Sequence, residues 1–206
     1  MKFSFIAWIV GPVIAVLAIL RIFFVDVAVV GHNGMAPTLI AGDQIAVWRD
    51  AQLERGDVAM CGHPNRPGEY TVGRILARMG DHITYERNQI RINGLRPELD
   101  FRARMAFVDT VANVTYDVVP VTEVFGNIKH EVFNPVDNEI WLKSKQVQRG
   151  FFLLGDNRTR RHADDSRFFG EVDPLTCKGK VFLRLRPSET TPAELKHNWL
   201  DWISGS

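Results

Sequence analysis

Residues 31–43 read GHNGMAPTLIAGD, and the interpretation of the whole chain starts from this stretch. Glycine, asparagine and proline favour turns, so the stretch predicts a tight turn that also carries the apolar side chains Met35 and Leu39. Residues 22–30, just before it, are rich in β-branched and aromatic residues and end at Gly31, which predicts a strand. The turn is therefore expected to begin where a strand ends.

Three further motifs lie along the chain after this turn. Residues 55–58 read RGDV, and residues 70–81 read YTVGRILARMGD. The last motif has two halves, GDNR at residues 155–158 and DSRFFG at residues 165–170. A Gly-Asp pair alone is a common turn former, so each motif taken singly carries little information about function.

Together the four motifs resemble the conserved boxes of type I signal peptidases. The first is similar to the box Ser-Met-x-Pro-Thr-Leu-x-x-Gly-Asp, and Gly34 stands where that family has its nucleophilic serine. The stretch 70–81 is similar to the Lys-Arg box, whose closing Gly-Asp pair puts Gly73 at the lysine. The last motif matches the third box with two extra residues between its halves. Order and spacing make the resemblance specific, although residues 86–148 contribute almost nothing to it.

The chemistry of the family cannot be performed by these two glycines. Acyl transfer by a serine–lysine pair needs a hydroxyl for attack and a neutral amine that accepts the proton. Loss of one cooperating residue typically lowers turnover by on the order of a million-fold. The resemblance therefore implies a catalytically inactive homologue with no intact catalytic residue, Gly34 being at the nucleophile position and Gly73 at the general-base position.

Other box residues are kept and are candidates for binding or support. Met35 and Pro37 would line and shape a peptide site, and His32 stands where some family members have a small oxyanion-donating serine. The backbone N–H of Gly34 would be available to a bound carbonyl. The expected structural support of the site consists of Arg74, Asp165, Ser166 and Arg167. The alternative is that all of these residues only stabilise the fold.

No other residue is an evident substitute for the missing pair. Thr38 and Ser166 carry hydroxyls, but they match family positions that serve structure or support. Lys143 and Lys145 lie in the middle region and would have to reach back to the site. Ala163 falls near a point where the family has another polar helper, which indicates a relaxed catalytic requirement.

The N-terminus predicts a membrane anchor. Residues 3–20 contain no charged side chain, and a helix of that length would span roughly 27 Å, near the apolar thickness of a bilayer. We therefore expect one transmembrane helix over residues 1–21. A cleaved secretory signal and a buried core helix are the alternatives. The resemblance implies a single-pass protein of the cell membrane whose main domain lies on the extracytoplasmic side.

The expected fold is mainly β. Strands are predicted at residues 44–48, 58–61, 70–77, 82–85, 89–92 and 181–185, with turns at Asn88 and at Asn93-Gly94. The resemblance implies a signal peptidase I-like core domain of residues 22–85 and 150–187. Residues 86–149 would form an inserted second β domain.

The tail, residues 188–206, is expected to contain a short amphipathic helix, because its apolar residues fall along one helical side. These residues are Leu195, Trp199, Trp202 and Ile203. Cys61 and Cys177 lie far apart in sequence. An oxidising compartment would permit a disulfide, but nothing in the sequence brings the two within bonding range, and two buried free thiols are the favoured interpretation.

Composition excludes some classes of function. With 25 basic and 24 acidic side chains the net charge is +1, so nucleic acid is not an expected partner. The six histidines are scattered and no Cys-x-x-Cys or His-x-x-x-His spacing occurs, so neither a metal nor a cofactor is expected.

The leading hypothesis is a membrane-anchored, non-catalytic homologue that binds signal peptides, preproteins or the processing machinery, including an active signal peptidase paralogue. The alternative is an active signal peptidase that uses a non-standard or partner-supplied catalytic group. A pilus or conjugation peptidase on the same fold would also need serine and lysine. Glycines introduced by engineering to trap substrate are a further alternative, although alanine would disturb the backbone less.

Overall fold

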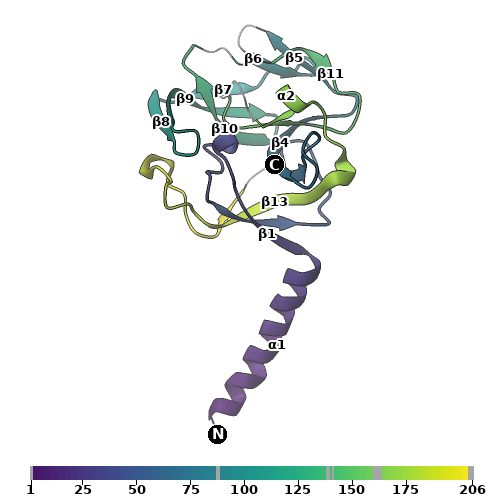
Figure 1. The fold of residues 1–206 in the computed structure, drawn as a ribbon, viewed down its shortest axis with the longest axis vertical. Helices are drawn as coiled ribbons and strands as arrows, with labels where there is room; N and C mark the ends of the chain where they lie inside the picture. Colours follow the sequence, from purple (N-terminus) through teal and green to yellow (C-terminus); the bar gives the residue numbers. More distant parts are fainter. Residues whose placement is uncertain (1, 87–88, 138–139, 141, 160–163, 204–206) are drawn as a thin grey trace.

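The computed structural model describes residues 2–86, 89–137, 140, 142–159 and 164–203, and its fold is mainly β, as expected (Figure 1). The largest sheet has seven strands, in the order β1-β2-β13-β3-β4-β12, with β14 pairing with β13. They are β1 (Val25–Val29), β2 (Gln44–Trp48), β3 (Val58–Gly62), β4 (Tyr70–Arg78), β12 (Phe151–Leu154), β13 (Cys177–Arg186) and β14 (Asp201–Trp202). The strand pairs of this sheet are antiparallel.

The turn of residues 31–43 lies on the core of this sheet. Met35 and Leu39 of the turn are fully buried in one apolar cluster together with Ile45 of β2 and Val181 of β13. A short 3-10 helix, η1 (Asn33–Met35), forms inside the turn. The buried side chains Met35 and Leu39 therefore anchor the turn to the sheet and fix the position of the turn's backbone.

Two smaller sheets occupy most of the middle of the chain. One contains β7 (Glu98–Phe101), β8 (Met105–Asp109), β9 (Val114–Phe125) and β10 (Ile128–Pro135). The other contains β5 (His82–Glu86), β6 (Gln89–Ile92) and β11 (Lys145–Gln146). Three short helices follow along the chain: α2 (Ser166–Phe169), η2 (Pro174–Thr176) and η3 (Ala193–Leu195). The turn predicted at Asn88 falls outside the described residues.

These smaller sheets share their cores with the rest of the molecule. Ile83 and Ile90 are buried with Leu76 and Phe152 of the large sheet. In a separate cluster, Phe107, Val118 and Phe133 are buried with Ala36 and Ile40 of the turn. The division into a core domain and an inserted domain therefore stays a prediction, because β5 of the expected core pairs with strands of the expected insertion.

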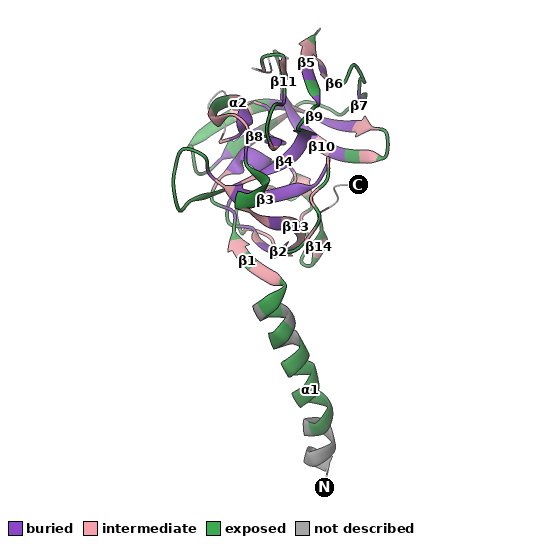
Figure 2. Cartoon of the chain, turned by 90° about the vertical axis from the view of Figure 1, so that its right-hand side faces the viewer, coloured by how far each residue is buried: buried purple, intermediate pink, exposed green. Residues whose placement is uncertain are grey.

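The N-terminal helix α1 (Lys2–Phe23) projects from the β body, and its described side chains are exposed (Figure 2). Within the described part of the chain, no helix combines the length and the apolar character that crossing a membrane requires. The transmembrane helix expected over residues 1–21 is thus not confirmed. Because α1 continues through Phe23, the strand predicted from residue 22 begins only at Val25.

A row of aromatic rings lies where α1 joins the sheet. Phe24 and Trp48 have their ring centroids 5.9 Å apart, Trp48 and Phe182 are 6.1 Å apart, and Phe182 and Trp202 are 5.8 Å apart. Trp202 is 72% exposed, so part of this row faces solvent. The row joins Phe24, which lies just before β1, with side chains of β2, β13 and β14 into one apolar surface.

The tail differs from the expected amphipathic helix. Its described residues form the 3-10 helix η3 and the strand β14, and β14 pairs with Leu183 and Arg184 of β13. Ile203 enters the core beside the turn, whereas Trp199 stays exposed. β14 pairs with the edge of β13, which a helix could not do. This pairing buries Ile203, one of the apolar residues from which the helix was predicted.

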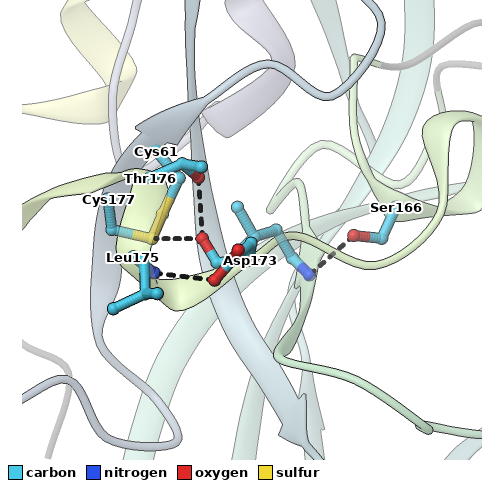
Figure 3. Close-up of a disulfide and its surroundings, with 7 residues drawn as sticks. Cys61, Ser166, Asp173, Leu175, Thr176 and Cys177 are labelled. Carbon is cyan, nitrogen blue, oxygen red and sulfur yellow. Dashed lines mark hydrogen bonds between the residues drawn. A yellow bond between two sulfur atoms is a disulfide. The ribbon is translucent and has the colours of Figure 1, made fainter.

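Cys61 and Cys177 form a disulfide, so the interpretation as free thiols is wrong (Figure 3). The two cysteines lie opposite each other in the pairing of β3 with β13, although 116 residues separate them in sequence. The carbonyl of Asp173 lies 3.9 Å from Cys177 Sγ, in the turn that leads into β13. The bridge ties the two strands that form the middle of the large sheet.

Candidate functional site

The two glycines at the expected catalytic positions lie on different elements, which a third segment brings together. Gly34 is buried in η1, and Gly73 is buried in β4. A Cβ atom placed on Gly73 would lie 3.0 Å from Leu153 Cβ. A Cβ atom on Gly155 would lie 2.4 Å from the carbonyl oxygen of Gly34. Residues 153–155 therefore lie against both glycine positions.

The backbone N–H of Gly34 is already used within the protein. It donates to Nδ1 of His32 at 3.0 Å, and this contact caps η1. The other ring nitrogen of His32, Nε2, lies 3.6 Å from a carboxylate oxygen of Asp164. The donor that would serve a bound carbonyl is thus occupied by a side chain.

The space beside Gly73 is filled. Leu153 is fully buried and pairs with Ile75 of β4 in the sheet. Its Cβ belongs to a paired strand and cannot move aside as the end of a flexible side chain can. A separation of 3.0 Å is shorter than the optimal carbon–carbon contact of about 3.5–4.0 Å. A side chain at position 73 would therefore require Leu153 of β12 to give way by a few tenths of an ångström.

A buried ion pair lies next to the turn. Arg74 Nε and Nη2 donate to the two carboxylate oxygens of Asp156 at 2.9 and 2.7 Å, and neither side chain is more than 2% exposed. Thr38 Oγ1 also donates to Asp156. Burial favours the neutral carboxyl, but the charge and hydrogen bonds of Arg74 outweigh it and lower the pKa of Asp156. The pair connects β4 with the turn of residues 31–43.

The other predicted supporting residues form a separate group. Arg167 Nη2 lies 2.8 Å from Asp165 Oδ2, and both side chains are almost fully buried. Asp165 and Ser166 accept hydrogen bonds from the backbone N–H groups of Gly155 and Leu153, at 3.1 and 2.9 Å. The charged support therefore includes two ion pairs, Arg74 with Asp156 and Arg167 with Asp165.

A third buried polar group was not predicted. Arg158 Nη2 donates to Glu123 Oε2 at 3.1 Å, and His130 Nε2 lies 3.3 Å from the same oxygen. Burial, together with the positive charge of Arg74, lowers the pKa of His130. Arg158 belongs to the GDNR motif and bonds to Gly155 within it, but it also bonds to Glu123 of β9 and Phe133 of β10, and no local pattern connects those strands with the motif.

Four side chains meet near Gly34, and we call His32, His63, Arg66 and Asp164 the Asp164 cluster. His63 Nε2 lies 2.9 Å from Asp164 Oδ1, and Arg66 Nη2 donates to both carboxylate oxygens at 2.6 and 2.7 Å. Burial favours the neutral carboxyl, but His32, His63 and Arg66 lower the pKa of Asp164 far below its ordinary value. The sequence offered one signal for this cluster, because Asp164 lies in the stretch where the third box is longer by two residues.

The remaining predicted residues do not replace the missing pair. Met35 is fully buried, and the carbonyl of Pro37 accepts a hydrogen bond from His197 Nε2 at 2.7 Å. Thr38 is engaged with Asp156, as described above. Lys145 lies 2.8 Å from Glu171, and Lys143 is exposed on the middle region. Ala163 lies outside the described residues.

Two strand edges are open beside this site. β12 pairs with β4 only from Arg74 onward, so no described strand covers the edge of residues 70–73. Glu69 and Ile75 both bond to the β3 side, and by antiparallel alternation Val72 directs its N–H and C=O groups away from β3. β1 is the other end of the sheet. Ala28 of β1 and Val72 pack on the same apolar cluster as Met35.

A family model described as signal peptidase, peptidase S26, matches residues 3–186. The chain belongs to the signal peptidase family. A signal peptidase I of Streptococcus pneumoniae (strain R6) is 34% identical over 185 residues, covering 85% of this chain and 89% of the relative. A signal peptidase I of Aquifex aeolicus is 26% identical, with 87% and 86% covered.

This signal peptidase family member is also similar to a protein of Staphylococcus aureus (strain COL) that is named inactive signal peptidase IA. It is 26% identical over 190 residues, covering 88% of this chain and 93% of the relative. A crystal structure of a signal peptidase I from Enterococcus faecalis is similar with a TM-score of 0.37 and 20% identity, over 64% of this chain and 97% of that one.

In this member of the signal peptidase family, the described site contains hydrogen-bond donors and the open edge of β4. Among its described residues, no nucleophile lies beside a general base. The hydroxyls of Thr38 and Ser166 are both hydrogen-bonded in supporting contacts. Over the described residues, no group of three or more histidine, cysteine, aspartate or glutamate side chains is arranged to hold a metal ion.

Proposed function

We propose that this protein is a non-catalytic member of the signal peptidase family that binds signal-peptide segments. One observation carries the proposal: glycine stands at both positions where the resemblance leads us to expect a catalytic residue, and the protein's own groups occupy the surroundings of each. His32 holds the N–H of Gly34, and Leu153 fills the space beside Gly73. The relative named inactive supports the idea that the family contains such members.

Strand addition is the proposed mode of binding. A peptide that lies along the outward N–H and C=O groups of Val72 would extend the sheet through main-chain hydrogen bonds. β1 offers a second edge across the same apolar cluster. Val30, the residue after β1, bonds to Asp43, so by antiparallel alternation residues 29 and 31 direct their N–H and C=O groups outward. Small side chains of the peptide would rest on that cluster. None of these contacts uses a serine or a lysine.

We further propose that α1 and the aromatic row hold the protein at a membrane, with the β body on the extracytoplasmic side. Exposed Trp8, Ile14 and Ile19 on α1 give the helix an apolar surface. Trp48 and Trp202 continue that surface onto the sheet, and tryptophan favours the membrane–water interface. The disulfide fits an oxidising compartment. In this location the protein would compete with an active paralogue for signal peptides, or accompany it.

The first expected result concerns cleavage. The purified protein should not cleave a preprotein in detergent, and the variant Gly34→Ser/Gly73→Lys should also stay inactive, because a lysine at position 73 meets Leu153. Residual hydrolysis is measured by gel electrophoresis of a labelled preprotein beside an active signal peptidase as positive control. Cleavage by the unmodified protein would overturn the proposal. Cleavage by the variant alone would show that Leu153 moves more easily than its strand pairing indicates.

The second expected result concerns binding. Val72→Pro removes the outward N–H of Val72, and proline is tolerated at a strand edge where the N–H faces outward. A fluorescent signal-peptide segment should therefore bind the variant about tenfold more weakly, or worse, because a hydrogen bond and the fit of the strand are lost. Fluorescence anisotropy measures the dissociation constant. Val72→Ala keeps the N–H and is the matched control; an equal loss in both variants would exclude strand addition at this edge.

A further inference from the structure

The Asp164 cluster has the composition of a binding site for a carboxylate. Arg66 contacts both oxygens of Asp164 through one nitrogen, and His63 contacts one of them at hydrogen-bond distance. His32 approaches the other oxygen at 3.6 Å. Arginine and histidine N–H groups on one carboxylate are a common means of recognising this anion in proteins. Asp164, an internal residue, fills the site in this structure.

The protonation of the two histidines follows from their other contacts. Nδ1 of His63 accepts a hydrogen bond from the backbone N–H of Asn65 at 3.1 Å, and Nδ1 of His32 accepts from Gly34 at 3.0 Å. An accepting Nδ1 places the ring proton on Nε2. Both rings therefore present an N–H toward Asp164 even when they are uncharged.

The cluster lies beside the open edge of β4. The hydroxyl of Thr71 donates to the main-chain oxygen of Asp164 at 2.9 Å, so residue 164 rests against the uncovered part of the strand. On its other side, the His32 ring separates Asp164 from the N–H of Gly34. Arg66 is 47% and His32 26% exposed, whereas the His63 side chain is only 6% exposed. A peptide on the β4 edge would bring its end close to these donors.

We propose that the Asp164 cluster binds the free C-terminal carboxylate of a peptide, so that the protein recognises released signal peptides rather than intact preproteins. In this proposal His32, His63 and Arg66 hold the terminal carboxylate, and Asp164 is a built-in competitor that occupies the same donors when no peptide is bound. The proposal rests on the proposed peptide-binding function and specifies its ligand. An intact preprotein has an amide at the corresponding position and offers these donors no negative charge.

Two matched peptides test the proposal. Both carry a signal-peptide sequence ending in Ala-Ser-Ala, one with a free carboxylate and one with a C-terminal amide. The free-acid peptide should bind the full-length protein roughly tenfold more tightly or better, because charge-assisted hydrogen bonds are lost in the amide. Asp164→Ala should strengthen binding of the acid further and leave the amide unchanged, since it removes the competitor. Arg66→Gln should reduce the preference for the acid.

Controls separate this proposal from the underlying function. Asp117→Ala removes an exposed carboxylate on β9 that pairs with Arg104, so it should change neither affinity. Equal binding of acid and amide, in the unmodified protein and in Asp164→Ala, would overturn carboxylate recognition while leaving strand addition supported. Binding of neither peptide would overturn both. An amidated peptide with an internal aspartate that binds as tightly as the acid would also overturn recognition of the C-terminus itself.

Discussion

Replacement of Asp156 by alanine should lower the free energy of unfolding by about 3–5 kcal/mol. The variant leaves Arg74 charged and buried, with an exposed fraction of 2%, and removes the acceptor of two of its hydrogen bonds. It also removes the acceptor of the Thr38 hydroxyl hydrogen. The loss is large because a buried guanidinium without its carboxylate cannot recover the hydration that it gave up on folding.

Urea unfolding followed by tryptophan fluorescence measures this loss in the full-length protein. Arg104→Ala is the matched control, because it breaks an ion pair whose side chains are 57% and 54% exposed, and such pairs contribute little. The double variant Arg74→Met/Asp156→Leu should recover much of the stability, since it removes both charges. A loss for Asp156→Ala no larger than that for the control would contradict the conclusion that this buried pair stabilises the fold next to the turn.

Gly155→Ala should destabilise the protein by about 3 kcal/mol and should also weaken peptide binding. The added Cβ would lie 2.4 Å from the carbonyl oxygen of Gly34, which accepts a hydrogen bond from Asn157 at 3.0 Å. Neither side can move freely, because the N–H of Gly155 donates to Asp165 and Gly34 lies within η1. The strain must therefore be relieved by a shift of the turn.

Gly31→Ala provides the comparison for this variant. A Cβ atom at Gly31 meets no atom within 4 Å, so this substitution should leave stability nearly unchanged. Thermal unfolding of both variants, together with binding of the fluorescent peptide, distinguishes a local overlap from a general intolerance of alanine. Equal stability of the two variants would mean that the 153–155 segment is not fixed against Gly34.

Local patterns predicted much of the sheet but few of its long-range contacts. The strands expected at residues 44–48 and 89–92 coincide with β2 and β6. Each is a short run with β-branched and apolar residues between two turns, and this local pattern is enough to predict a strand. The tail pattern was misleading. Its apolar residues match a helix in spacing, but the free side of β13 was available, and pairing with it buried Ile203.

The same limit explains the site. The boxes directed attention to Gly34, Gly73 and Arg74, which the structure brings to one region. The side-chain partners of these residues could not be predicted. Asp156 belongs to a recognised motif, but its pairing with Arg74 spans 82 residues of sequence. Asp164 meets His63 across 101 residues. The disulfide likewise depends on the register of β3 against β13, which no local pattern in the sequence specifies.

The contacts of the tail with the turn have a consequence for synthesis. His197 donates to the carbonyl of Pro37, Arg184 donates to that of Thr38, and Ile203 lies in the core beside Met35. On a translating ribosome the first strands emerge well before these residues. The turn that carries Gly34 therefore gains its last supports only after residue 203 has left the exit tunnel. A nascent chain stalled earlier would present an unfinished site to any peptide it meets.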